Sequence, residues 1–290
     1  MTLTATADLI AAATARESAV LAFNVIGIEH AEAIAAGAEL AGVGVLMQVS
    51  ENTVRFHGGR IAPLVSACAR IAADSSQAVA VHLDHFQDLE LLSAAIGDAA
   101  DLGVTSIMID AAHLPYAENV ERTASFARRA HAAGVWVEGE LGEIGGKGAH
   151  APGVRTDPAE AFDFATRTGV DALAVAVGST HAMTTRDALL DVELISRLAD
   201  RVPVPLVLHG SSGVADDHLV DAVSAGIRKV NIGTALNVAY TAAVRAALER
   251  EPERVDPRPH LSAGRDAVAD AVARFCTAIA LSPSTAGEIR

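Results

Sequence analysis

Short apolar runs alternate with amphipathic stretches along nearly the whole chain. The runs are rich in Val, Ile and Leu, and each predicts a buried β-strand. Strands separated by helices pair in parallel, and eight repeats favour closure into a (β/α)8 barrel, the TIM barrel of the α/β class. The eight expected strands are Leu21–Asn24, Val43–Val49, Ala78–Asp84, Ser106–Asp110, Val135–Glu140, Ala172–Val177, Leu206–His209 and Lys229–Ile232.

Between these runs, apolar residues recur at intervals of three and four, which is the spacing of one helix face. Asp157 precedes Pro158 as an N-cap precedes a first-turn proline, and Gly42, Gly103 and Gly169 stand where C-cap glycines belong. A short helix is also expected at the N-terminus, and a last one, Asp266–Ala280, within a C-terminal extension over 251–290. The helices expected between strands are Glu29–Leu40, Ile61–Ala73, Leu89–Asp101, Ala117–Ala132, Pro158–Thr168, Asp191–Ala199, Asp216–Ala225 and Ala235–Ala247.

An open doubly wound sheet is the structural alternative to the barrel. Its usual G-x-G-x-x-G turn is missing after the first strand, where the sequence reads Asn24 to Ile28. No low-complexity linker or change of composition divides the chain, so residues 1–290 are expected to form a single domain. A glycine-rich stretch, Leu141–Arg155, follows the fifth strand and is either a mobile active-site lid or a flexible surface loop.

Charge and composition narrow the class of partner. The formal net charge is −14 and aromatic residues make up 3% of the chain, so neither a nucleic-acid partner nor a base-stacking platform is expected. A few local donors still suffice for a small phosphorylated ligand. The chain has no apolar run long enough for a membrane span, no signal peptide, and two distant cysteines, Cys68 and Cys276. A cytoplasmic protein is therefore expected.

Three histidines end or closely follow predicted strands: His85, His181 and His209. Barrel enzymes carry their active sites at these carboxyl ends. Neutral imidazole is a common ligand of zinc and related ions, and three protein ligands leave an open position for substrate. The three histidines together predict a divalent metal centre, although any one of them alone is compatible with an ordinary structural role.

Asp84 directly precedes His85 at the end of the third strand. A carboxylate beside a metal either exchanges a proton with a substrate oxygen or holds the tautomer of a ligating histidine. His82 is expected to lie on the opposite side of the strand from His85, because side chains alternate across a strand, and we predict a structural role for it.

Further acidic candidates end the fourth and fifth strands. Glu140 is either an additional or alternate metal ligand or a buried ion-pair partner of Lys147 or Arg155. Asp110, with His113 beyond it, is a candidate for supporting the metal's surroundings.

Small residues follow the sixth, seventh and eighth strands, in the segments Gly178-Ser179, His209–Gly213 and Asn231–Thr234. Glycines let backbone N–H groups approach an anion, and Ser or Thr hydroxyls add donors. Loops at these strand ends are a frequent phosphate site in this fold. The segments together predict an oxyanion site.

Seven motifs, in this order along the chain, resemble the class II, metal-dependent ketose-bisphosphate aldolases, in the branch of fructose- and tagatose-bisphosphate aldolases. The resemblance runs from about Asp8 to Arg258. The motifs are Ala22–Asn24, His82–His85, Met108–Pro115, Val137–Gly142 with Gly145-Gly146, Ala174–His181, Leu206–Gly213 and Lys229–Thr234.

The resemblance implies an aldehyde-lyase that reversibly cleaves a phosphorylated ketose into dihydroxyacetone phosphate and an aldehyde such as glyceraldehyde 3-phosphate. Fructose 1,6-bisphosphate, tagatose 1,6-bisphosphate or a related ketose 1-phosphate is the implied substrate. A zinc ion or similar divalent metal is expected on His85, His181 and His209, with Glu140 close to it. Asp84 is expected to be the acid/base at the substrate C4 oxygen.

The resemblance also implies how the substrate is held. Asn24 and Ser50 match substrate-contacting positions, and Arg258 matches an arginine that reaches the far phosphate, often across a subunit boundary. A monovalent cation near the phosphate loops and a homodimer or homotetramer are expected. The dihydroxyacetone-phosphate half is assigned to Gly178, Gly210, Ser212, Asn231, Gly233 and Thr234.

Two stretches depart from the family pattern. Where the family has an acidic pair on its mobile loop, this chain has Lys147 to His150 with no acid, and Ala182 replaces the glycine after the second metal histidine. Glu143, His150 and Asp157 are the candidates to replace the acids. A related carbon–carbon lyase for sulfonated or non-phosphorylated ketoses, and a sugar-phosphate-binding homologue with little or no turnover, therefore stay as alternatives.

Overall fold

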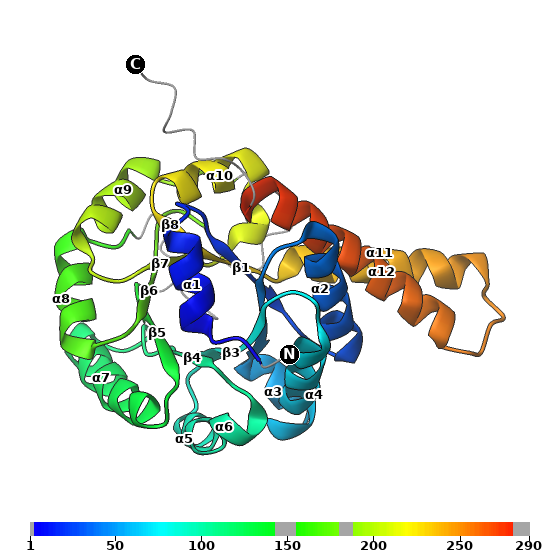
Figure 1. Ribbon diagram of the computed structural model, residues 1–290, viewed down its shortest axis with the longest axis horizontal. Coiled ribbons are helices and arrows are strands. Elements are labelled where there is room, and N and C mark those ends of the chain that lie inside the picture. Colours follow the sequence, from blue (N-terminus) through cyan, green and yellow to red (C-terminus); the bar gives the residue numbers. More distant parts are fainter. Residues whose placement is uncertain (1–2, 143–154, 180–187, 281–290) are drawn as a thin grey trace.

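A closed barrel of eight parallel strands forms the centre of the molecule (Figure 1). The computed structural model describes residues 3–142, 155–179 and 188–280. Neighbouring strands pair in chain order, and β8 pairs back to β1, which confirms the predicted TIM barrel and excludes the open sheet. The strands are β1 (Val20–Asn24), β2 (Val45–Ser50), β3 (Val79–Phe86), β4 (Ser106–Ile109), β5 (Trp136–Leu141), β6 (Ala172–Val175), β7 (Leu206–Leu208) and β8 (Ile227–Ile232).

Helices surround the barrel and alternate with its strands (Figure 1). Within the described ranges, no helix has the length and apolar character needed to cross a membrane. The helices are α1 (Thr6–Thr14), α2 (Ile28–Ala41), α3 (Glu51–Phe56), α4 (Ala62–Asp74), α5 (Leu89–Gly97), α6 (Ala99–Leu102), α7 (Tyr116–Ala132), α8 (Pro158–Thr168), α9 (Val192–Arg201), α10 (Asp216–Ser224), α11 (Thr234–Arg250) and α12 (Arg258–Phe275), with a 3₁₀ turn at Ser211–Gly213 and a π-helical turn at Cys276–Ala280.

Every predicted strand is present, but the helices differ from the prediction in three places. The helix expected over Leu89–Asp101 is broken at Asp98 into α5 and α6. The short helix α3 was not predicted; it starts directly after β2, where the side chain of Ser50 caps it. The last helix starts at Arg258 instead of Asp266, because Pro259 fits the first turn of a helix and does not delay its start.

Local chemistry fixes the ends of α8 as the sequence predicts. Asp157 Oδ1 accepts hydrogen bonds from the backbone N–H groups of Ala159 and Glu160, at 2.8 and 3.0 Å. At the other end, Gly169 has φ 68°, the left-handed conformation that glycine adopts without steric cost. Asp157 therefore serves as a helix cap at the start of the segment that leads to β6.

The barrel interior is apolar at its amino end. Helix α1 lies across this end (Figure 1). Its Thr6 hydroxyl is hydrogen-bonded to Ser106 Oγ at 2.7 Å, which ties the helix to β4. Because this end is filled and closed, polar inward-facing groups collect toward the carboxyl end. The packed apolar residues are Leu9, Ile10 and Ala13 of α1 with Val20, Ala22, Leu46 and Ala80 of the strands.

The C-terminal extension forms a helical hairpin with α11 that projects beyond the barrel (Figure 1). Helix α12 packs closely on α2: a Cβ added at Gly37 would lie 2.6 Å from the carbonyl oxygen of Ala269. Leu236 is the buried residue of α11, whereas Val238 is 53% exposed. The extension is thus anchored to the barrel through α12, whereas most of α11 is not buried.

We expect Asp157→Ala to lower the free energy of unfolding by about 1 kcal/mol, because the first turn of α8 would lose its capping oxygen. Urea unfolding of the two proteins measures the difference. Asp157→Asn keeps an oxygen at the same position and is the matched control. Equal losses in both variants would show that the cap is not what stabilises this turn.

Candidate metal and substrate site

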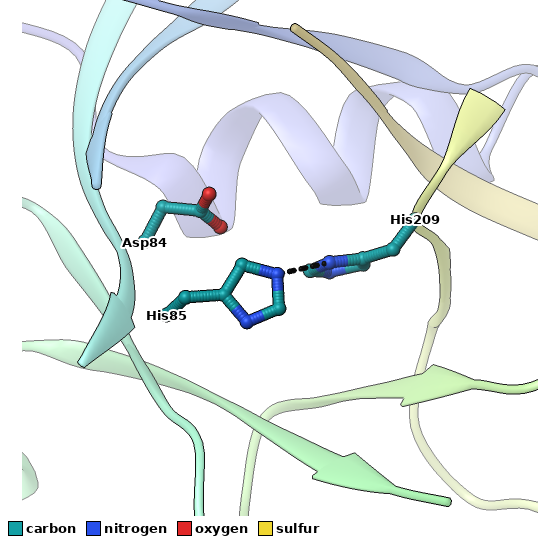
Figure 2. Close-up of side chains that lie close together, drawn as sticks. All are labelled: Asp84, His85 and His209. Atoms are coloured by element: carbon teal, nitrogen blue, oxygen red, sulfur yellow. Dashed lines mark hydrogen bonds between the residues drawn. The ribbon is translucent and has the colours of Figure 1, made fainter. Parts of the chain in front are cut away.

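Three predicted side chains meet at the carboxyl end of the barrel. Asp84 and His85 come from β3, and His209 comes directly after β7. Figure 2 shows the two imidazole rings turned toward each other with the Asp84 carboxylate beside them. His85 Nε2 and His209 Nδ1 are 2.9 Å apart. Two of the three predicted metal histidines therefore lie next to each other, whereas His181 lies outside the described residues.

A backbone irregularity lets Asp84 and His85, which are adjacent, both face this site. In a regular strand they would point to opposite sides. His85 instead has φ 52°, in the left-handed region, and the pairing of β3 with β4 shifts register between Leu83 and Phe86. A non-glycine residue in this conformation is strained, so the surrounding structure must hold it there.

The same irregularity overturns the predicted orientation of His82 relative to His85. His82 is fully buried and its Nε2 lies 3.9 Å from Asp84 Oδ1, so it faces the interior like Asp84 and His85. The expectation that His82 and His85 lie on opposite sides was wrong, because the turn at His85 interrupts the alternation. His82 Nδ1 is hydrogen-bonded to Ser106 Oγ at 2.8 Å.

Carboxylates surround His85. Its Nδ1 lies 3.1 Å from Asp110 Oδ2 and 3.6 Å from Glu140 Oε2. Burial lowers the pKa of His85, but Asp84, Asp110 and Glu140 outweigh it and raise the pKa to about 10. Burial raises the pKa of Asp110, whereas His85 and the Gln87 amide bring it down to about 2. The carboxylates around His85 therefore stabilise a positive charge there.

His209 has the opposite tendency. Burial is the largest influence and lowers its pKa, so the ring is neutral, the form that binds metals. Its Nε2 lies 2.8 Å from Glu138 Oε1, and the Lys229 ammonium lies 2.7 Å from Glu138 Oε2. Burial raises the pKa of Glu138, but Lys229 and His209 hold it well below its usual range. Glu138 is therefore a buried, ionised carboxylate.

The donor atoms present suit a divalent ion. Those of Asp84, His85 and His209 lie within 4.8 Å of one another, and so do those of His85, Asp110 and Glu140. Imidazole nitrogen and carboxylate oxygen are the ligands of catalytic zinc sites. Glu140, predicted as an additional ligand, is close enough to belong to the same cluster.

A pocket adjoins this cluster and contains most of the predicted substrate residues. Asn231 Nδ2 donates a hydrogen bond to Asp84 Oδ1 at 3.3 Å, which joins the eighth strand to the cluster. Asn231 Oδ1 is buried without a hydrogen-bond partner in the part of the chain that is described. The lining residues are Asn24, Gln48, Asp84, His85, Gly210, Ser211, Ser212, Asn231, Gly233 and Thr234.

One part of the pocket lies at the N-terminus of α11. Ser212 Oγ accepts a hydrogen bond from the backbone N–H of Ala235 at 3.1 Å, which places this serine at the N-terminus of α11. A Cβ added at Gly233 would lie 3.0 Å from Asn24 Oδ1, so a side chain there would displace Asn24. Backbone N–H groups at a helix N-terminus attract anions.

Three predicted substrate residues are not among the pocket-lining residues. Ser50 Oγ accepts from Thr53 N at 3.2 Å as the cap of α3. Gly178 has φ 124° and precedes Ser179, whose hydroxyl donates to the backbone oxygen of His209 at 2.5 Å. Arg258 lies at the start of α12, 87% exposed and paired with Asp256 at 2.7 Å. Ser50 nevertheless pairs in register with Asp84, and Gly178 is next to the residue bonded to His209, so of the three only Arg258 has no such link to the site.

Other candidates divide in the same way. Asp110 belongs to the cluster, but His113 is exposed. Of the predicted lid, the structure describes Leu141, Gly142 and Arg155. Residues 143–154, which include Glu143, Lys147 and His150, lie outside the described ranges, and so does Ala182.

Sequence reasoning missed Gln48, Glu138 and Lys229 as members of the site. Gln48 Nε2 donates to Asn24 Oδ1 at 2.6 Å and lines the pocket. All three are polar side chains within the barrel strands, and each is almost fully buried. Such residues must find buried partners, and that signal could have identified them.

Comparisons with known proteins agree with one another. The family model described as "Fructose-bisphosphate aldolase class-II" matches residues 4–282. The fructose-bisphosphate aldolase of Geobacillus stearothermophilus is 37% identical over 273 residues, covering 92% of this chain and 93% of the relative. That of Thermus caldophilus is 34% identical over 293 residues, with 91% and 94% covered. The crystal structure of the YdjI aldolase from Escherichia coli K12 is similar with a TM-score of 0.82 and 30% identity, covering 99% of this chain and 100% of that one.

Lys229→Met is expected to lower the free energy of unfolding by about 3–5 kcal/mol at neutral pH, because it leaves the Glu138 charge buried without its cation. Guanidinium unfolding measures this loss. The paired variant Glu138→Leu/Lys229→Met removes both charges and should lose clearly less. Equal losses in the single and paired variants would contradict the assignment of an ionised Glu138.

Proposed function

The chain belongs to the class II fructose-bisphosphate aldolase family, and we propose that it cleaves fructose 1,6-bisphosphate, tagatose 1,6-bisphosphate or a related ketose 1-phosphate. The products are dihydroxyacetone phosphate and an aldehyde such as glyceraldehyde 3-phosphate, and the reaction is reversible. The enzyme is an aldehyde-lyase. The observation that carries the proposal is the meeting of Asp84, His85 and His209 at a pocket lined by small polar residues.

The family is metal dependent, and we assign the ion to His85 and His209, with His181 as the third histidine and Glu140 close by. Zinc is our choice, since neutral imidazole is among its preferred ligands. When bound, such an ion supplies a Lewis acid for the negative charge left by carbon–carbon cleavage. A monovalent cation near the phosphate loops is part of the same proposal.

Asp84 is the proposed acid/base. Burial raises its pKa, but His85, His209 and Lys229 bring the pKa below its usual value, so the carboxylate is ionised. Its hydrogen bond from Asn231 fixes one oxygen. An ionised carboxylate lining the pocket can accept the proton of the substrate C4 hydroxyl as the C3–C4 bond breaks. It returns that proton in the condensation direction.

The phosphate of the dihydroxyacetone half is assigned to the cradle of Gly210, Ser212, Gly233 and Thr234, with Gly178 and Asn231 beside it. This cradle joins small residues to the N-terminus of α11, a helix of 17 residues, whose dipole favours an anion. Asn24 would contact the substrate from the opposite wall.

We assign the far phosphate to Arg258 supplied by a second subunit. Ser50, which pairs in register with Asp84, is assigned to substrate contact within the same chain. The support is geometric: Arg258 is 87% exposed at the start of α12, on the hairpin that projects from the barrel (Figure 1). A homodimer or homotetramer is therefore proposed.

The chain is taken as one catalytic domain over 1–290, with 251–290 as its extension. Its two cysteines, Cys68 and Cys276, are buried and unpaired, which suits a reducing compartment. We propose the cytoplasm as its location.

A second candidate reaction is favoured by one observation in the sequence: no acid occurs between Lys147 and His150, where the family has an acidic pair. A related lyase acting on a sulfonated or non-phosphorylated ketose would fit that change. A sugar-phosphate-binding homologue without turnover would bind dihydroxyacetone phosphate but would not exchange its C3 hydrogen with solvent.

A panel of ketoses separates these functions. With zinc restored, we expect turnover of at least one ketose phosphate, and loss of that turnover after treatment with a chelator, because the Lewis acid is removed. The panel contains fructose and tagatose 1,6-bisphosphates, ketose 1-phosphates, and sulfonated and non-phosphorylated ketoses. Full turnover in chelator, or activity on unphosphorylated ketoses alone, would overturn the proposal.

Asp84→Ala should lower kcat by about 10²-fold or more, as expected for removal of a general acid/base, while zinc content stays near that of the unchanged enzyme. Steady-state kinetics and metal analysis of the same sample measure both. His209→Ala is the contrasting variant and should lose the metal itself. Near-normal kcat in Asp84→Ala would assign the proton transfer to another group.

A further inference from the structure

A buried hydrogen-bonded chain crosses the barrel beneath the site. Lys229 of β8 contacts Glu138 of β5, and Glu138 contacts His209 at the end of β7, at 2.7 and 2.8 Å. All three side chains are 0% exposed. The chain thus links strands on different sides of the barrel without any solvent contact.

The chemistry of these groups decides where the hydrogen on His209 lies. An ionised carboxylate has no proton to donate, and a lysine ammonium has only donors. Glu138 Oε2 accepts from Lys229, and Glu138 Oε1 lies 2.8 Å from His209 Nε2. The amide Nδ2 of Asn231 also lies near His209 Nε2, at 3.1 Å, but it already donates to Asp84 Oδ1. The shorter contact with an ionised carboxylate favours a hydrogen on Nε2, which leaves the lone pair on Nδ1. That is the nitrogen facing His85 Nε2 at 2.9 Å (Figure 2).

We propose that Glu138 is a positioning residue of the metal centre, which fixes the tautomer and ring orientation of His209, and that Lys229 holds Glu138 in place for this purpose. The inference rests on the proposed function, in which His209 is a metal ligand. With Glu138 absent, His209 is free to carry its hydrogen on Nδ1, and that tautomer cannot bind the ion through Nδ1.

Stability alone gives little reason for such a pair. Two buried charges lose their hydration, and apolar residues of similar volume serve a barrel core equally well or better. This barrel already uses apolar residues lower down, at Leu46 and Ala80. A carboxylate that holds a ligating histidine typically contributes 10–100-fold in metal affinity. In this proposal, the Glu138–Lys229 pair is present because it orients His209 for binding the metal ion.

The test compares zinc affinity in the full-length protein, by competition with a chromophoric chelator. In Glu138→Leu/Lys229→Met, where no charge is left unpaired, we expect the zinc Kd to rise about 10–100-fold. Asp171→Asn is the matched control: Asp171 accepts from the backbone N–H of Val137 at 2.7 Å, next to Glu138 on β5, but outside the cluster. Its zinc Kd should stay unchanged.

A folded Glu138→Leu/Lys229→Met protein with the zinc Kd of the unchanged enzyme would overturn the inference. His209→Ala in the same assay separates the two proposals. If His209→Ala also binds zinc normally, the proposed metal site is wrong; if it loses zinc while the paired variant keeps it, only the role of Glu138 is wrong.

A second measurement needs no change at Glu138 or Lys229. Nitrogen NMR of the metal-free enzyme labelled with ¹⁵N-histidine, with His209 assigned by its loss in His209→Ala, reports the tautomer directly. We expect a protonated Nε2 and an unprotonated Nδ1 on His209. A proton on Nδ1 would contradict the inference even if the paired variant failed to fold.

Discussion

The ion pair between Glu138 and Lys229 is the interaction on which the rest of the site depends. A charge without water at the centre of a barrel is stable only when a partner compensates it. Lys229 keeps Glu138 ionised, and on its other side Glu138 lies 2.8 Å from His209 Nε2. Because the carboxylate is held from two sides, the imidazole above it has one arrangement. In the proposed metal site, His209 would be a rigid ligand because of this buried ion pair.

A second constraint concerns the backbone. In the proposed site, one strand end supplies both the acid/base and a metal ligand, whereas regular alternation would turn Asp84 and His85 apart. The left-handed conformation of His85 removes that conflict. Such a conformation costs of order 1–3 kcal/mol, and it persists because packing and hydrogen bonds on both sides over-determine it. Asp110 supplies one of those bonds, at 3.1 Å from His85 Nδ1.

The periodicity of the sequence was sufficient to predict the barrel, because strand and helix positions follow from local spacing and each strand is a short buried run. Convergence of Asp84, His85 and His209 also followed, since parallel strands end on one rim. The orientation of His82 did not, because a single φ angle at His85 changes the alternation. Glu138 and Lys229 were missed because they lie far apart in the sequence, and their pairing between β5 and β8 exists only in three dimensions.

The charge balance at the carboxyl end of the barrel relates metal binding to phosphate binding. Asp84, Asp110, Glu138 and Glu140 face two cationic groups, His85 and Lys229, so the carboxylates are in excess. None of the described pocket-lining residues is a lysine or an arginine. An anionic substrate entering this field alone would be repelled, and neutral donors at the N-terminus of α11 offer limited compensation. A divalent cation on the histidines would offset most of this excess negative charge. Metal binding is therefore expected to govern substrate affinity as well as chemistry, which explains why an enzyme with a net charge of −14 can select a phosphorylated sugar.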